Sequence, residues 1–170
     1  MELLKLTSFQ ETLHEAMCGP ASLKIVLNYY NIEKTEDELA ELMGKTDDGT
    51  DEKGFAKAAE DLGLDIEIQN ESSFADIQKW LDKNVPVVVD WFTRGRIDYP
   101  DSEIADGHYS VAAGLDEECI YLQDPEIGGM RKIKRNDFMR VWFDFSGKYI
   151  SPTELIIRQS IAIYPKSRKD

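Results

Sequence analysis

Three residues that could act together in nucleophilic catalysis stand far apart in the sequence: Cys18, His108 and Asp124. A thiol attacks a carbonyl carbon as its thiolate, and an imidazole within hydrogen-bond reach can take the proton that the thiol carries. A carboxylate on the far side of the imidazole fixes its tautomer and stabilises the charged ring. Gln10 offers a side-chain amide that, with the backbone N–H of Cys18, could bind the oxyanion of a tetrahedral intermediate. These residue types predict acyl-transfer chemistry if the fold brings them together.

The segment that carries Cys18 predicts a buried helix. Within residues 16–30, from residue 21 onward, apolar side chains cover most of the helical circumference, and only a narrow polar stripe interrupts them. Pro20 suits the first turn, because the N–H that proline lacks has no intrahelical acceptor there. Cys18 is therefore expected at the N-terminal end of the helix, where the dipole and the unpaired amides favour the thiolate. Gly19 carries no side chain that would obstruct a substrate.

Two strands are expected to bring His108 to Asp124. Residues 108–113 and 119–123 have the apolar character of strands, and residues 114–118 form the turn between them. Because His108 and Asp124 lie equally far from the centre of this turn, they should be cross-strand neighbours at the open end of a hairpin. This argument places a carboxylate beside an imidazole without any assumption about function.

The remaining pattern gives the fold class. Helices are expected at residues 35–44, at 55–62, after Ser73 and through Phe138, and strands at residues 2–9, 64–68, 85–92, 130–134 and 156–164. Helices dominate the first half of the chain and strands the second. This order predicts an α+β fold with the N-terminal helices packed on one side of a mainly antiparallel β-sheet. Residues 1–170 show no internal repeat or domain boundary, so we expect a single domain.

Composition and charge exclude several classes of protein. A net charge of −13 argues against binding to nucleic acid or to an anionic membrane surface, because both need a basic face. No apolar run is long enough for a transmembrane helix, and the first residues lack the pattern of a signal peptide. The two cysteines, Cys18 and Cys119, do not make a disulfide framework, so a cytoplasmic setting is expected and Cys119 is expected to be a core residue. The oligomeric state is not indicated.

The chain resembles a known family, the papain-like cysteine peptidases of the bacteriocin-processing type, and would be a stand-alone domain of that family. The resemblance covers about residues 6–129 and rests on Gln10, Cys18-Gly-Pro-Ala-Ser-Leu23, Gly107-His108-Tyr-Ser-Val111 and Asp124-Pro125 followed by Gly128. It implies a papain-like fold, a peptide or protein substrate and no cofactor or metal. It also implies that Cys18 is the nucleophile, His108 the base, Asp124 its orienting partner and Gln10 an oxyanion donor. The gap from Gln10 to Cys18 is longer than usual in the family.

The main hypothesis is therefore a hydrolase that cleaves a peptide or isopeptide bond through Cys18, His108 and Asp124. Two alternatives stay open. The same acyl-enzyme could pass to an amine or a thiol, which would make the protein an acyl or peptidyl transferase. A non-catalytic peptide-binding module could also keep the fold and the groove without turnover.

Plainer explanations exist for individual residues. His108 could be a buried, hydrogen-bonded structural histidine, and Asp124-Pro125 could simply begin a turn. His14 could share a metal with His108, although the spacing matches no zinc pattern. The acidic loop 93–106 is either a connector or, as we hypothesise, a wall of the substrate groove that favours neutral or basic peptides.

Overall fold

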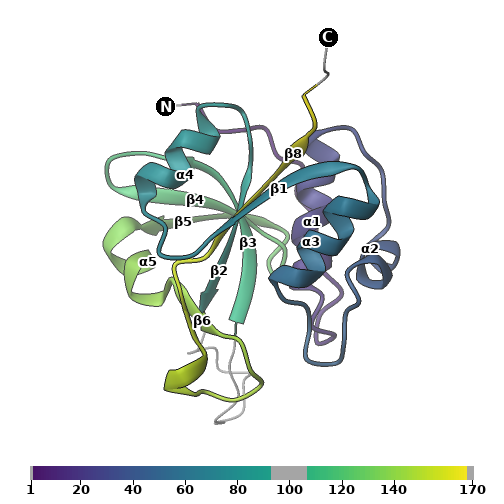
Figure 1. The fold of residues 1–170 in the computed structure, drawn as a ribbon. Coiled ribbons are helices and arrows are strands. Elements are labelled where there is room, and N and C mark those ends of the chain that lie inside the picture. Colours follow the sequence, from purple (N-terminus) through teal and green to yellow (C-terminus); the bar gives the residue numbers. More distant parts are fainter. Residues whose placement is uncertain (1, 93–106, 168–170) are drawn as a thin grey trace.

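The computed structural model describes residues 2–92 and 107–167 (Figure 1). Its helices are α1 (Cys18–Tyr29), α2 (Glu36–Leu42), α3 (Glu52–Asp61), α4 (Phe74–Leu81) and α5 (Arg135–Val141), with one 3-10 turn at Pro152–Glu154. Its strands are β1 (Leu64–Gln69), β2 (Val87–Phe92), β3 (Gly107–Leu115), β4 (Cys119–Asp124), β5 (Gly129–Lys134), β6 (Phe143–Phe145), β7 (Leu155–Ile157) and β8 (Ser160–Pro165).

Six strands form one twisted sheet in the order β1-β8-β2-β3-β4-β5, and β6 pairs with β7 in a separate two-stranded ribbon. Every neighbouring pair in the six-stranded sheet is antiparallel. The predicted α+β class with a mainly antiparallel sheet is thus confirmed. Strand β8, which is the last strand along the chain, lies in the interior of the sheet between β1 and β2.

The sheet has a hydrophobic core on each face. Side chains alternate along a strand, so Val88 of β2 packs with α1, α2 and α3, whereas Val87 and Val89 pack with α4 and α5. In Figure 1 the three N-terminal helices lie on one side of the sheet and the other two helices on the opposite side. The prediction that the N-terminal helices pack on one side of the sheet is therefore confirmed for α1–α3, whereas α4 and α5 cover the opposite face.

The helix boundaries follow local chemistry. Thr35 and Ser73 form capping boxes at the starts of α2 and α4, and the Asp51 carboxylate accepts hydrogen bonds from two amides of α3. Helix α1 differs, because its N-cap is the apolar residue Met17. It is held by burial instead: eight of its residues are buried, including Leu23 and other members of the core.

Three segments differ from the predictions. Residues 2–9 form no strand, although the Leu4 N–H donates a hydrogen bond to the Ala113 carbonyl. The expected final strand is split into β7 and β8, because Arg158 adopts a positive φ of 47° that no strand tolerates. Strand β6 pairs over only three residues, which is too short for a periodic signal in the sequence.

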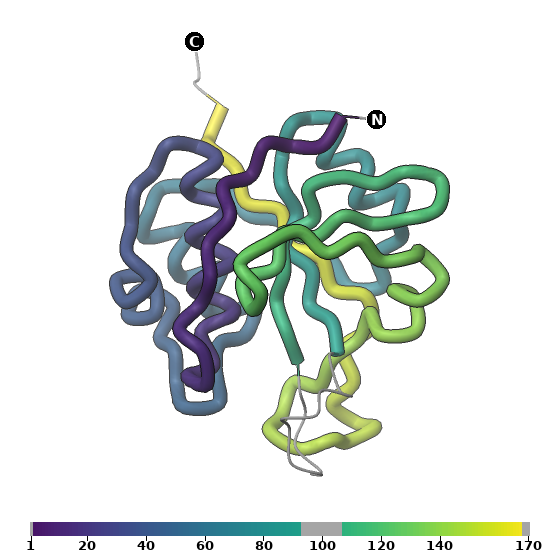
Figure 2. Tube along the Cα trace, turned by 180° about the vertical axis from the view of Figure 1, so that it is seen from behind, coloured from purple at the N-terminus to yellow at the C-terminus, as the bar shows by residue number. Residues whose placement is uncertain are grey.

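The N-terminal segment links the two sides of the molecule. Figure 2 shows it, in purple, running along the back between the N-terminal helices and the sheet before it turns into α1. Its Glu11 N–H donates to the Pro125 carbonyl, which fixes the segment next to the turn after β4. The segment therefore delivers α1, and with it Cys18, to the ends of β3 and β4.

Candidate active site

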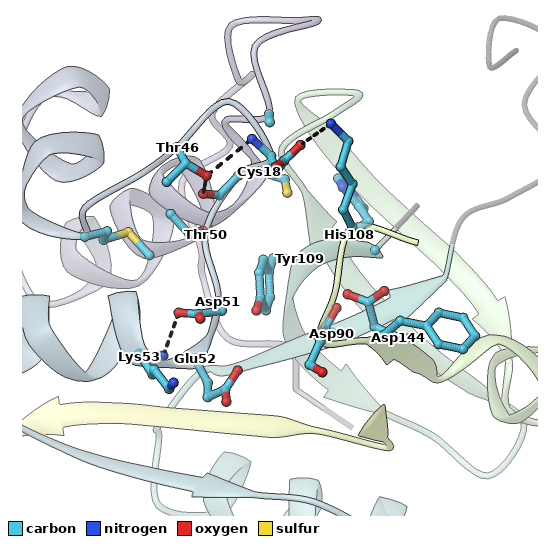
Figure 3. A pocket seen from close by; sticks show the side chains of 18 of the residues that line it. Cys18, Thr46, Thr50, Asp51, Glu52, Lys53, Asp90, His108, Tyr109 and Asp144 are labelled. Carbon is cyan, nitrogen blue, oxygen red and sulfur yellow. Dashed lines mark hydrogen bonds and ion pairs between the residues drawn. The ribbon is translucent and has the colours of Figure 1, made fainter. Parts of the chain in front are cut away.

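Cys18 and His108 line the same cavity, which has a volume of about 900 Å³. Cys18 is the first residue of α1 and His108 is the second residue of β3. Figure 3 shows the two side chains at this cavity, with Tyr109 and several acidic residues below them. The cavity thus opens where the helical part of the molecule meets the sheet.

The Cys18 thiol is partly buried and touches the backbone of the strand that carries His108. Backbone hydrogen bonds from Tyr109 and Gly19 favour the thiolate, as expected for a helix start. Burial, however, disfavours the thiolate more strongly, and the negative charges of Glu11 and Asp90 add to this effect. The pKa of the Cys18 thiol is therefore raised to about 12, whereas the sequence predicted that it would be lowered.

Gly19 serves packing rather than substrate access. A Cβ atom at this position would overlap the hydroxyl of Thr50. The residue must therefore be glycine so that the loop before α3 can lie against the first turn of α1. This contact places Thr50 on the cavity wall.

His108 is bonded to Asp124. The imidazole Nε2 lies 2.7 Å from Asp124 Oδ1, and both side chains are buried, at 5% and 0% exposed. Trp91 packs edge-on against the ring, with 5.7 Å between the ring centroids. Because Nε2 is hydrogen-bonded to Asp124, Nδ1 is the ring nitrogen that can accept a proton from a donor in the cavity.

The hairpin register differs from the simple prediction. Val111 pairs with Gln123, but Gly114 pairs with Tyr121, so the register shifts at a bulge after Ala112. Asp124 consequently lies two residues away from direct opposition to His108, and the two side chains meet diagonally. The predicted neighbourhood holds, while the predicted direct pairing is wrong because the turn lies closer to β4 than expected, with Leu115 paired to Ile120.

Two further charged residues surround the Asp124 carboxylate. Arg131 of β5 donates from Nε to Asp124 Oδ2, and its Nη2 lies 3.9 Å from Glu126 Oε2. The Glu126 N–H donates to Asp124 Oδ1 at 2.9 Å. Burial would raise the pKa of Asp124, but hydrogen bonds and positive charge from His108 and Arg131 lower it below its usual value. Asp124 is therefore an ionised carboxylate.

The structure places Gln10 beside this cluster. Its side-chain amide donates to the Glu126 carbonyl at 3.1 Å, and its stem packs against Gly128. Among the described residues, the cavity wall includes Glu11 but not Gln10. The amide in this conformation is thus bound to the turn after β4.

A second acidic group lines the cavity on the other side of Tyr109. Asp90 of β2 is opposite Tyr109 in the strand register, and its carboxyl is hydrogen-bonded to that of Asp144. Burial raises the pKa of Asp90 well above its usual value, and the charges of Asp144 and Glu52 raise it further. Asp144 can approach this closely because residue 107 is glycine, where a Cβ would overlap the carboxylate.

His108, Asp124 and Glu126 could be considered as metal ligands. One ligand atom from each lies within 4.8 Å of the others, and His14 is not part of any such group among the described residues. A cation at this point would meet the Arg131 guanidinium, which already contacts the Asp124 carboxylate. The arrangement is better described as an ion-pair network than as a metal site.

Reasoning from the sequence missed the acidic residues around the thiol. Asp90 was the visible exception, since it is a lone acid within the apolar strand Val87–Phe92. Arg131 gave no signal, because it belongs to an ordinary alternating strand. Cys119 is 4% exposed, which confirms it as a core residue. The predicted groove wall at residues 93–106 lies outside the described residues.

A family model and several relatives match the chain. The Peptidase_C39 like family matches residues 6–150. The chain is 29% identical over 150 residues to the lactococcin transport/processing ATP-binding protein LcnC-like of Lactococcus lactis subsp. lactis, covering 88% of this chain and 19% of that protein. It is 34% identical over 130 residues to an uncharacterized protein of Methanothermobacter thermautotrophicus, covering 74% and 75%.

The fold matches as well. The crystal structure of the peptidase domain of Streptococcus ComA, a bi-functional ABC transporter involved in quorum sensing, superposes with a TM-score of 0.70 at 20% identity, over 95% of this chain and 99% of that one. The expected papain-like fold is confirmed by this match. Within the described part of the chain, no helix is long and apolar enough to cross a membrane. The family match, which covers most of the chain, confirms the resemblance seen in the motifs: this chain belongs to the Peptidase_C39 like family.

Proposed function

We propose that this chain is a cysteine peptidase in which Cys18 is the nucleophile, His108 the general base and Asp124 the residue that orients His108. The observation that carries the proposal is the 2.7 Å bond between His108 Nε2 and an ionised Asp124, beside a cysteine that lines the same cavity as His108. Membership of a peptidase family supports it. The arrangement has the parts of a nucleophilic triad.

The resting thiol keeps its proton, so the reaction begins with proton transfer. As Cys18 Sγ bonds to the substrate carbonyl carbon, its proton passes to His108 Nδ1, and the carbonyl π electrons move to the oxygen. The Asp124 carboxylate stabilises the imidazolium that forms. When the C–N bond breaks, Nδ1 returns the proton to the leaving amine, and water then hydrolyses the thioester and restores the thiol.

The oxyanion of the tetrahedral intermediate needs hydrogen-bond donors, and this proposal assigns two. The backbone N–H of Cys18 lies in the first turn of α1, where amides have no intrahelical acceptor. Gln10 is the second donor in this proposal. Its carboxamide must leave the Glu126 carbonyl and turn toward the cavity when substrate binds.

The substrate is proposed to be a peptide or protein. The Lactococcus relative is named as a transport and processing protein, and this chain spans 19% of its length. The chemistry fits both peptide and isopeptide bonds, and an amine or thiol acceptor in place of water would make the same acyl-enzyme a transferase. A cytoplasmic setting, as expected from the cysteine content, belongs to the same proposal.

The test is the pH dependence of Cys18 alkylation by iodoacetamide, followed by mass spectrometry. If His108 supplies the base, the wild type reacts at neutral pH, and the pH profile of His108→Gln is shifted to more alkaline pH. Cys119→Ala is the matched control and should keep the wild-type profile, because Cys119 is buried. Identical profiles for wild type and His108→Gln would exclude His108 as the base.

One observation favours the alternative of a non-catalytic peptide-binding module, namely the raised pKa of the Cys18 thiol. A peptide library screened with the wild type and Cys18→Ala separates the two functions. The peptidase produces fragments only with the wild type. A binding module would bind the same peptides in both forms and cleave none.

A further inference from the structure

We propose that Arg131 is a positioning residue for the catalytic pair, holding Asp124 in place so that His108 keeps its reactive orientation. This inference rests on the proposed function and adds a positioning residue to it. Arg131 comes from β5, the edge strand of the sheet, where the register sets it opposite Leu122 of β4. Its guanidinium reaches back over the end of β4 to Asp124.

The two oxygens of the Asp124 carboxylate have different hydrogen-bond partners. Oδ1 accepts hydrogen bonds from His108 Nε2 at 2.7 Å and from the Glu126 N–H at 2.9 Å. Oδ2 accepts from Arg131 Nε. A carboxylate gripped at both oxygens cannot rotate, so the direction in which it faces the imidazole is fixed by the guanidinium.

Charge gives the second part of the argument. Asp124 is 0% exposed, and burial by itself favours its protonated form. The groups that face it are His108 from β3, Glu126 from the turn after β4 and Arg131 from β5. Glu126 is a second acid, 4.0 Å from His108 Nε2, so Arg131 is the fixed positive charge that balances both carboxylates.

Arginine suits this task better than lysine. Its planar group directs one N–H at Asp124 while a second nitrogen lies near Glu126, and it stays charged at every relevant pH. One third of the Arg131 side chain is exposed, so placing its charge beside Asp124 costs little desolvation free energy. Without it, the two acids would repel each other and the His108–Asp124 pair would take up a proton more readily.

The experiment measures Cys18 alkylation by iodoacetamide from pH 4 to pH 9 in the full chain. The acid limb is the part of the profile where the alkylation rate falls as pH is lowered. Arg131→Gln should shift this limb to higher pH by about one pH unit, and Arg131→Lys should keep it near its wild-type position. Lys132→Gln removes the same charge one residue away, on the opposite face of β5, and should leave the limb unchanged. A limb that does not move in Arg131→Gln overturns the proposal, even if the melting temperature falls.

A measurement on the wild type keeps the test decisive if Arg131→Gln does not fold. The chain contains two histidines, so nitrogen NMR can assign the His108 ring once His14→Gln identifies the other. We expect the proton on Nε2 at neutral pH and an Arg131 Nε–H that exchanges slowly with water. A fast-exchanging Nε–H would overturn the inference. Failure of the His108→Gln test alone would instead remove the proposed function, so the two failures are distinguishable.

Discussion

Two buried aspartates on either side of β3 show opposite behaviour. Asp124 on β4 is 0% exposed and ionised, whereas Asp90 on β2 is 2% exposed and holds its proton. Both side chains are almost fully buried, and burial raises the pKa of each, so exposure alone does not account for the difference. The neighbours do: Asp124 faces His108 and an arginine, while Asp90 faces the acids Asp144 and Glu52.

The comparison shows how two carboxyl groups on strands that flank β3 can serve different tasks. The ionised carboxylate stabilises positive charge on His108, which the proposed reaction creates and removes in each cycle. The protonated one adds little charge near the thiol while it keeps its proton, and it links β2 to β6 through Asp144. Breaking either pairing should reveal which group the chemistry depends on.

The largest effect is expected for Asp124→Asn. The amide has the same shape but cannot stabilise the imidazolium and allows the wrong tautomer, so the rate of peptide cleavage should fall on the order of 10⁴-fold. The melting temperature should fall too, because Arg131 loses its charged partner.

Measuring both quantities separates the two roles of Asp124. A purely structural aspartate would lower stability and leave the alkylation rate per folded molecule unchanged. Unchanged alkylation of Cys18 across pH 5 to 9 would therefore remove Asp124 from the proposed site.

A smaller effect, in stability, is expected for Asp90→Asn. The pKa of Asp90 is raised in the folded state, so its contribution to stability is complete below its unfolded pKa of about 3.9 and is lost as pH rises toward the folded value. Asparagine does not titrate. The stability of the variant relative to the wild type should therefore rise by up to about 1.4 kcal/mol per pH unit within that window. Urea unfolding from pH 4 to pH 8 measures this gain.

The sign is opposite for Asp124, and this sharpens the comparison. Its pKa is lowered on folding, so its contribution is present above about 3.9 and is lost as pH falls through the folded value. The loss of stability in Asp124→Asn relative to the wild type should thus be largest near neutral pH. Parallel stability curves for Asp90→Asn and the wild type would show that Asp90 is ionised after all.

The smallest effect is expected for Glu11→Gln. The negative charge of Glu11 helps to raise the pKa of the Cys18 thiol, so its removal should raise the thiolate fraction at neutral pH. We expect iodoacetamide to react with Cys18 about three- to tenfold faster. Glu15→Gln changes the same charge at an exposed position of the same segment and is the matched control. Equal acceleration in both variants would point to the overall charge of the molecule.

Local pattern predicted the elements that carry the chemistry. The apolar surface of α1 placed Cys18 at a helix start, and the two strands after residue 107 placed His108 near Asp124. These features depend on periodicity and on short connections, which the sequence contains directly. The single domain over residues 1–170 and the cytoplasmic setting stay predictions.

Tertiary contacts explain what the pattern missed. The position of the turn and the bulge after Ala112 together set the register of β3 and β4, and strand length alone reveals neither. The pKa of Cys18 was predicted in the wrong direction because only helix position was considered. Burial of the thiol raises this pKa most, and the acids Glu11 and Asp90, which come from other segments, raise it further. Arg131 could not be distinguished from its neighbours until β5 was seen beside β4.

The position of β8 in the sheet has a consequence for folding during synthesis. Because residues 160–165 form the strand between β1 and β2, those two strands cannot be joined until this late part of the chain has left the ribosome. The helices that carry the cysteine can form early, but the sheet that carries the histidine closes last, through contacts between distant residues that slow folding. A nascent chain thus has Cys18 on a helix before the six-stranded sheet that contains His108 is complete.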